Sequence, residues 1–289
     1  MSKKQAKQKR KVRKTDLTRR SAGFCALTRT SGFLVDCHLI PKAFTSPSEK
    51  GGFFVQAGEG TTPIRRWSSW YDPHLVTAAG ELILRDLDTW AIELLRRRKL
   101  VWSGWEGSDL SAEGFNLYTP DFGARLIEDE DSARLRRFFL SLLWRAAASH
   151  LPEFQKVQVS REDLESLRLA VLGHHVPPVT FYPVQICQLH TKGPTHNQTP
   201  LDISREIPSI SGSSPPRLSP AFRFYFDGLI THFICPGDAA EEAKDCGNLY
   251  IGVNSAFAVP TFSYESSFQK RAYDEVTGSY DQLFASPLL

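Results

Sequence analysis

Clusters of apolar residues between positions 23 and 39 predict a β-hairpin. The segments 23–27 (GFCAL) and 32–39 (GFLVDCHL) are short apolar runs separated by Thr28-Arg29-Thr30-Ser31. Short apolar runs bounded by turn-forming residues are typical of paired strands. We therefore expect a hairpin whose return strand ends near His38. The following segment, residues 45–65, is rich in Gly, Ser, Thr and Pro and is expected to be a loop.

Three later segments show the spacing of helices. In residues 81–101 one face carries the apolar positions Leu84, Leu87, Ala91 and Leu94. Residues 131–150 have a wide apolar stripe, which predicts a core helix. A third helix is expected to start after Ser160, with Asp163 completing a variant of the capping box, and to end at Gly173. Residues 102–125, rich in glycine and aromatic residues, are expected to be irregular.

The C-terminal part is expected to be β structure. The runs 222–226 and 229–234 are separated by Asp227-Gly228, a strong signal for a hairpin turn. Residues 249–253 and 257–262 are expected to add strands, and residues 191–220 to form a long loop. The fold class is thus predicted to be α+β, with three parts: a basic tail at 1–22, a domain at 23–125, and a helical and antiparallel β region at 126–289.

The net charge of +3 is unevenly distributed. Residues 1–20 contain ten Lys or Arg and one acid, Asp16, and the remaining chain has a net charge of −6. The tail has too few apolar residues to fold alone and would attract phosphates. A solubilising terminus and a nuclear localisation signal are the alternatives.

Other features of composition exclude several classes of protein. The tail lacks the apolar segment of a secretory signal, and no run of about 18 apolar residues predicts a membrane span. The five cysteines form no Cys-x-x-Cys pair, which favours reduced thiols, a cytoplasmic location and no four-cysteine zinc site. The motifs of P-loop ATPases, α/β-hydrolases and zincins are missing.

The segment Asp36-Cys37-His38-Leu39-Ile40-Pro41-Lys42 carries the main candidate chemistry. A histidine at a strand end, followed by a loop and a helix, is the layout of a ββα-metal nuclease. In that chemistry histidine activates water and a divalent cation stabilises charge on the phosphate. The alternative is a hydrogen-bonded structural histidine.

This segment resembles bacterial HNH-endonuclease-like proteins, which carry an Asp-Ser-His-Ile-Ile-Pro-Lys motif and then a Leu-Leu-Cys-x-x-Cys-Glu turn and a helix. The corresponding segments here are 36–44 and 75–81, and 140–146 is similar to a downstream region of the family, so the resemblance spans about residues 23–175.

The resemblance implies a role for each matching residue. His38 takes the place of the general base, and Asp36 and Glu81 take places of ligands for Mg²⁺ or another divalent cation. Asp72 or His74 lies near the place of a middle asparagine that orients the base, and His74 is also a candidate metal ligand.

The chain departs from the family at four positions: it lacks three of the four zinc-binding cysteines and the middle asparagine. The two cysteine pairs that bind a structural zinc in such proteins correspond to Cys25, Thr28, Thr77 and Gly80. A structural zinc is therefore not expected, and the middle asparagine is also missing. A nuclease-like scaffold that no longer cuts is the main alternative to an enzyme.

Basic residues near the motif are candidate phosphate contacts: Lys42, Arg65 and Arg66. Arg65-Arg66-Trp67 and Trp70-Tyr71 interleave basic and aromatic residues, a mixture that can stack on bases, although a packed loop with surface arginines is the alternative. His190 and His196, in a segment rich in Pro and Thr, are expected to be solvated loop histidines.

The predicted function is metal-dependent hydrolysis of phosphodiester bonds in nucleic acid, with DNA first, and the resemblance implies defence of a bacterium against foreign DNA. A catalytically inactive module that binds nucleic acid or a protein partner is the alternative. A third hypothesis is a purely structural or interaction protein, with the C-terminal β region as its contact surface.

Overall fold

A computed structural model describes residues 21–45, 54–57, 64–67, 69–107, 110, 116–128, 131–207, 217–241 and 247–285. The chain has a mixed α+β fold, which confirms the predicted class. Apart from residues 21 and 22, the predicted basic tail lies outside the described residues. None of the helices in the described part is long and apolar enough to cross a membrane.

A small antiparallel sheet contains β1 (Ala22–Phe24), β2 (Ser31–His38) and β5 (Tyr71–Thr77) in the order β1-β2-β5. The predicted hairpin is confirmed, because β1 pairs with β2 and β2 ends at His38. The 3₁₀ helix η1 (Lys42–Phe44) follows β2. Helix α2 (Ala78–Arg97) follows β5 directly, so it begins before the expected residue 81. Between β2 and β5 the chain forms η1, β3 and β4, and β3 and β4 belong to the larger sheet.

The larger sheet has nine strands in the order β4-β3-β9-β10-β11-β8-β12-β7-β6. Its pairs are antiparallel except β3 with β9 and β8 with β12. The strands are β3 (Phe54–Ala57), β4 (Ile64–Arg66), β6 (Asn116–Thr119), β7 (Phe122–Glu128), β8 (Val184–Leu189), β9 (His196–Ile207), β10 (Arg217–Phe226), β11 (Leu229–Ile234) and β12 (Ala256–Phe262). Asp227-Gly228 joins β10 to β11, which confirms the predicted hairpin.

Three segments expected to be loops or irregular contain strands. Residues 45–65 contain β3 and the start of β4, residues 102–125 contain β6 and the start of β7, and residues 191–220 contain β9 and the start of β10. The expectation was wrong because each strand is formed by pairing with distant residues, as in the parallel pairing of Val55 with His196. Residues 249–253 also differ, since they hold the end of the 3₁₀ helix η5 (Gly247–Leu249) and an isolated bridge.

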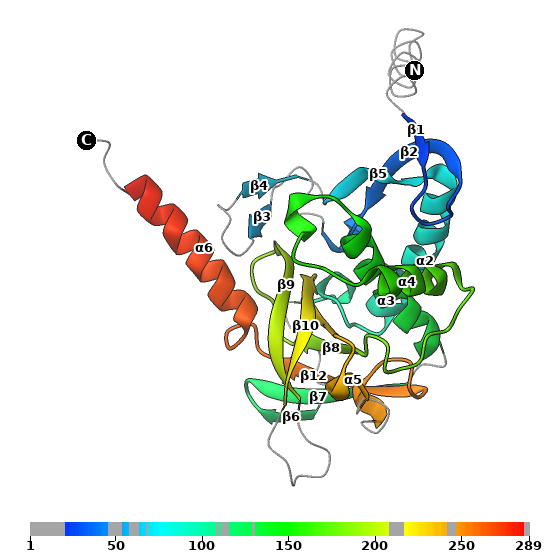
Figure 1. Ribbon diagram of the computed structural model, residues 1–289. Helices are drawn as coiled ribbons and strands as arrows, with labels where there is room; N and C mark the ends of the chain where they lie inside the picture. Colours follow the sequence, from blue (N-terminus) through cyan, green and yellow to red (C-terminus); the bar gives the residue numbers. More distant parts are fainter. Residues whose placement is uncertain are drawn as a thin grey trace, which may run out of the picture.

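Helices α2 and α3 (Ser132–Ala148) connect the two sheets. Helix α2 packs on β2 and β5, and α3 contacts α2, α4 (Arg161–Leu172) and β8 (Figure 1). Ser160 accepts a hydrogen bond from the Asp163 backbone N–H, and Gly173 ends α4 in the left-handed conformation, so both predicted caps are confirmed. The remaining 3₁₀ helices are η2 (Trp102–Gly104) and η3 (Pro152–Phe154), and the short helix α5 (Asp238–Glu241) and helix α6 (Phe268–Ala285) follow β11 and β12.

One buried core runs through both sheets. Val76 of the small sheet, Phe138 of α3 and Phe224 of the large sheet belong to the same cluster. The predicted boundary at residues 125–126 falls inside β7. The two histidines expected in a solvated loop are buried, because His196 begins β9 and His190 follows β8.

Replacing Asp227 with asparagine is expected to change how stability depends on pH. Burial raises the pKa of this carboxyl to about 6 from an ordinary value of 3.8. The folded state then holds a proton that the unfolded chain has lost, so stability falls as pH rises from about 4 to 6, by at most about 3 kcal/mol. The asparagine side chain can still accept a hydrogen bond from the Ser103 backbone N–H. Asparagine is also a favoured residue in a hairpin turn such as the one between β10 and β11.

Urea unfolding between pH 4 and pH 8 measures the effect. Asp227→Asn should be more stable than wild type at pH 8, and the difference should close at pH 4. The exposed Asp202→Asn serves as the control. If the stability of wild type and of Asp227→Asn changed with pH in the same way, the raised pKa of Asp227 would not be the cause of the pH dependence.

Candidate functional site at the end of strand β2

His38 occupies the last position of β2, opposite Tyr71 of β5. Its half-buried imidazole lies 6.4 Å from the Tyr71 ring, between ring centres. Burial lowers the pKa of His38, and the nearby Lys42 lowers it further. The imidazole is therefore neutral at pH 7 and can accept a proton or a hydrogen bond.

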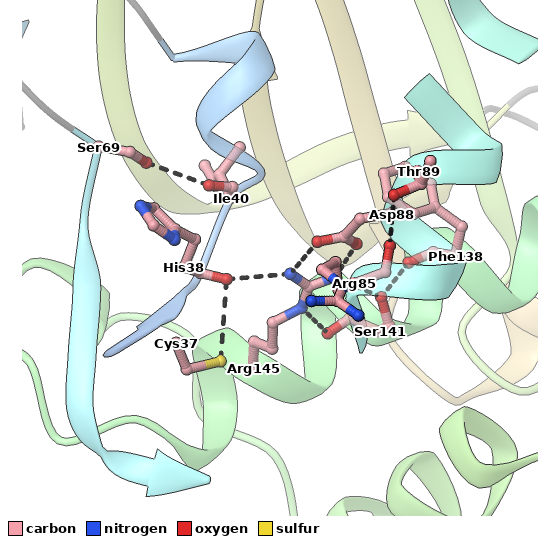
Figure 2. Close-up of polar contacts among 10 residues, drawn as sticks. All are labelled: Cys37, His38, Ile40, Ser69, Arg85, Asp88, Thr89, Phe138, Ser141 and Arg145. Carbon is pink, nitrogen blue, oxygen red and sulfur yellow. Dashed lines mark hydrogen bonds and ion pairs between the residues drawn. The ribbon is translucent and has the colours of Figure 1, made fainter. Parts of the chain in front are cut away.

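A buried arginine holds the backbone of His38. Arg145 of α3 donates from Nη1 to the His38 carbonyl at 2.9 Å, and its side chain is 1% exposed. The same guanidinium makes two hydrogen bonds to Asp88 of α2, at 2.5 Å to Oδ1 and 2.9 Å to Oδ2, and one to the Ser141 hydroxyl (Figure 2). Burial would lower the pKa of Arg145, but Asp88 raises it overall, so the guanidinium keeps its charge. This pair ties α2 and α3 to the end of β2.

The sequence reasoning missed Arg145 and Asp88. Arg145 lies within the segment 140–146, where the wide apolar stripe of residues 131–150 predicts only a core helix. The available signal was an arginine inside a core helix, since a buried arginine needs either an acidic partner or several carbonyl acceptors.

Glu81 lies on the other side of β2 from the imidazole. Glu81, in the first turn of α2, acts electrostatically on the buried thiol of Cys37, and that thiol donates to the His38 carbonyl at 4.0 Å. Burial raises the pKa of both groups. Because neighbouring residues of a strand project to opposite faces, Cys37 and His38 point in opposite directions. Accordingly, the ring of His38 points away from Arg145 and toward Ser69 and Ile40 in Figure 2.

The other predicted ligands are dispersed. Asp36 is exposed at a bulge of β2, and His74 is exposed on β5. Asp72 is buried and accepts hydrogen bonds from the His74 backbone N–H at 2.8 Å and the Ser149 hydroxyl at 2.7 Å, so it stabilises the start of β5. Within the described ranges, no group of three or more His, Cys, Asp or Glu side chains could hold a metal ion. Asp36, Glu81 and His74 lie at a bulge of β2, in the first turn of α2 and on β5, respectively.

Two exposed side chains, Lys42 of η1 and Tyr71 of β5, lie near His38, and the Tyr71 side chain is 46% exposed. Trp67, which follows β4, is 62% exposed. Arg65 and Arg66 lie on β4, at the edge of the large sheet, and their side chains lie outside the described residues.

Residues 25, 28, 77 and 80, the positions compared above with zinc-binding cysteines, lie close to one another. The buried Cys25 sulfur accepts a hydrogen bond from the Thr28 backbone N–H at 3.4 Å. Burial acts to raise the pKa of the Cys25 thiol, but hydrogen bonds from Thr28 and Thr77 lower it overall. A Cβ on Gly80 would lie 2.7 Å from the same sulfur. A structural zinc site needs four ligands, and among these four positions only Cys25 supplies a thiol.

Comparison of the chain with protein families, with curated proteins and with solved structures found no match in any of the three.

Proposed function

We propose that this chain binds nucleic acid through β2, β5 and α2, on a nuclease-like scaffold that does not cut it. The observation that carries the proposal is the pair of His38 and the exposed Tyr71 beside Lys42. The exposed Tyr71 ring can stack on a base, and the neutral His38 imidazole can accept a hydrogen bond from a base. Lys42 can bind a phosphate group. The basic segment 1–20 adds non-specific attraction to the backbone.

The lack of cleavage follows from the positions of the acids. Asp88 is hydrogen-bonded to Arg145, and Glu81 lies near Cys37, on the opposite face from the imidazole. The acids that a cation beside His38 would need are thus used elsewhere or dispersed.

Binding can be measured by fluorescence anisotropy with single-stranded DNA, duplex DNA and RNA of equal length. Tyr71→Ala is expected to weaken binding by about five- to a hundredfold, because stacking on one ring contributes about 1–3 kcal/mol. Tyr118→Ala, which removes an exposed tyrosine from β6 of the other sheet, is the matched control. Equal affinity of the two variants would place the contact surface elsewhere. Deleting residues 1–20 should weaken binding most at low salt.

The scaffold itself can be tested by restoring the missing thiols. The triple variant Thr28→Cys, Thr77→Cys, Gly80→Cys is expected to bind one equivalent of Co²⁺ with the absorption of a tetrahedral thiolate site, because the four positions already meet. Adding Cys25→Ser to the triple variant should abolish that spectrum. A triple variant that folds but binds no metal would argue against the resemblance.

A metal-dependent nuclease is the second candidate, and the lowered pKa of His38 favours it because a neutral imidazole can accept a proton from water. A plasmid-nicking assay with Mg²⁺, Mn²⁺ or Ni²⁺ compares wild type with His38→Ala. Nicking that EDTA and His38→Ala both abolish would establish the enzyme and displace the first proposal. Nicking that is equal in both proteins would remove His38 from the mechanism.

We further propose a cytoplasmic location in a bacterium and a role against foreign DNA, from the resemblance and from free thiols at Cys25, Cys37, Cys187 and Cys235.

A further inference from the structure

Two phenylalanine side chains of the small sheet are exposed next to each other. Phe24 of β1 is 56% exposed, and Phe33 of β2 is 64% exposed. Phe33 pairs with Ala22 in the register, and Ala22 and Phe24 are alternate residues of β1. Paired residues and alternate residues project from the same face of a sheet, so both rings lie on one face, as diagonal neighbours about 7–8 Å apart. Single exposed apolar residues are common, but two adjacent aromatic rings form a patch that favours a partner.

The basic segment 1–20 joins the folded chain beside this pair of rings. The segment contains ten Lys or Arg and one acid, and it leads directly into Ser21 and β1. Arg20 precedes Phe24 by four residues, so the chain length alone keeps their Cα atoms within about 14 Å of each other. β1 is the outer strand of the small sheet, at one end of the molecule (Figure 1). One ligand can therefore reach both the rings and the cations.

The folded part of the chain does not attract a polyanion through its net charge, which is −6 outside residues 1–20. Arg29, in the connection between β1 and β2, forms an ion pair with the Glu165 carboxylate of α4 at 3.0 Å. A nucleic acid would therefore gain its electrostatic attraction from residues 1–20, and its contact with the sheet must not depend on charge. Stacking on exposed rings is a contact of this kind.

We propose, as a refinement that rests on the proposed nucleic-acid binding, that Phe24, Phe33 and the basic segment 1–20 bind a single strand, with an unpaired base on each ring. An aromatic ring can stack on any base, because every base has a flat π face. In a duplex each base is paired and is covered by its neighbours in the stack, so rings on a sheet reach only a terminal base pair. A single strand can turn its bases out toward such rings, while the cations of residues 1–20 bind its phosphates.

An anionic lipid surface would also attract the basic segment, but it would use the rings differently. It would gain from their apolar area and not from their flat faces. The basic segment contains no aromatic residue, and its apolar residues are Met1, Ala6, Val12 and Leu17, too few for the apolar face of a membrane-bound helix. Nucleic acid is therefore the favoured partner. Substitution by leucine separates the two, because leucine keeps apolar area and lacks a π face.

Fluorescence anisotropy of the full chain with single-stranded DNA, single-stranded RNA and duplex DNA of equal length tests the proposal. The double variant Phe24→Leu, Phe33→Leu is expected to bind single strands at least about fivefold more weakly, because stacking is lost. Its affinity for the duplex should stay within about twofold of wild type, because that binding depends on residues 1–20. Phe122→Leu, which replaces a 40% exposed phenylalanine of β7 in the large sheet, is the matched control. Urea unfolding of each variant checks that the fold is kept.

The salt dependence of binding provides a second readout. Affinity for a polyanion falls with salt in proportion to the number of phosphates that the protein neutralises. The double leucine variant removes no charge, so its slope of log affinity against log salt should equal that of wild type. Deletion of residues 1–20 should make the slope clearly shallower. An unchanged slope after this deletion would overturn the role of the basic segment.

Three outcomes would overturn the role of the rings. The first is equal affinity of wild type and the double leucine variant for single strands, and the second is an equal loss for single strands and duplex. The third is wild-type protein that sediments with vesicles of phosphatidylcholine and phosphatidylserine but binds no single strand, which would assign the surface to lipid.

The variant Tyr71→Ala separates this surface from the one proposed around His38. Weaker binding in Tyr71→Ala alone would keep the proposed function and overturn the role of Phe24 and Phe33. Weaker binding in the double leucine variant alone would support the two rings and move the nucleic-acid surface from β5 to β1.

Discussion

Replacing Arg145 with methionine is expected to lower the free energy of unfolding by about 3–5 kcal/mol. The guanidinium is buried, and its removal would leave the Asp88 carboxylate without the two hydrogen bonds that neutralise it. The His38 carbonyl would lose its donor as well. Urea unfolding at pH 7 measures the loss.

A double variant separates the unpaired charge from the change in packing. Arg145→Met with Asp88→Asn should recover part of the loss, because the second substitution removes the carboxylate. Arg85→Met is the matched control, since this exposed arginine of α2 should cost less than about 0.5 kcal/mol. A loss below about 1 kcal/mol in the single variant would show that the pair does not hold α2, α3 and β2 together.

Replacing Gly228 with alanine is expected to destabilise the protein by about 3 kcal/mol. Asp227 and Gly228 have φ angles of 50° and 77°, which an alanine adopts at a cost of about 1–2 kcal/mol. A Cβ at Gly228 would also collide with the Trp102 indole ring, and such overpacking costs about 1–3 kcal/mol. The strain would reach β8, because the Gly228 carbonyl accepts the Leu189 N–H at 2.9 Å.

Gly278→Ala tests the same substitution without either penalty. Gly278 lies within α6, and a Cβ there would meet no atom within 4 Å. This control is expected to leave stability unchanged or to raise it by about 0.5–1 kcal/mol. If the two substitutions changed stability by similar amounts, neither the φ angle of Gly228 nor the contact with Trp102 would explain the loss in Gly228→Ala.

The candidate site was predictable in part. The pattern of residues 23–39 placed His38 at a strand end, and the structure agrees. It could not show which side of β2 faces α2, because a bulge between Val35 and Cys37 breaks the simple alternation of the strand. As a result, the side chain that lies near the Glu81 carboxyl is that of Cys37 and not that of His38.

Residues 25, 28, 77 and 80, which the resemblance groups as zinc-ligand positions, lie near one another around the Cys25 sulfur, and only one of them is a cysteine. The predicted cation ligands come from separate turns and strands, and they are not brought together.

By itself, the sequence determined the features that depend on neighbouring residues. The cap of α4 at Ser160, its end at Gly173, the apolar stripe of α3 and the Asp227-Gly228 turn all follow from local geometry. Only the tertiary structure decided the strands β3, β4, β6 and β9, the Arg145–Asp88 pair and the burial of His196. These features depend on partners far away in the chain, and the local pattern of apolar and polar residues contains no information about which partner is nearby.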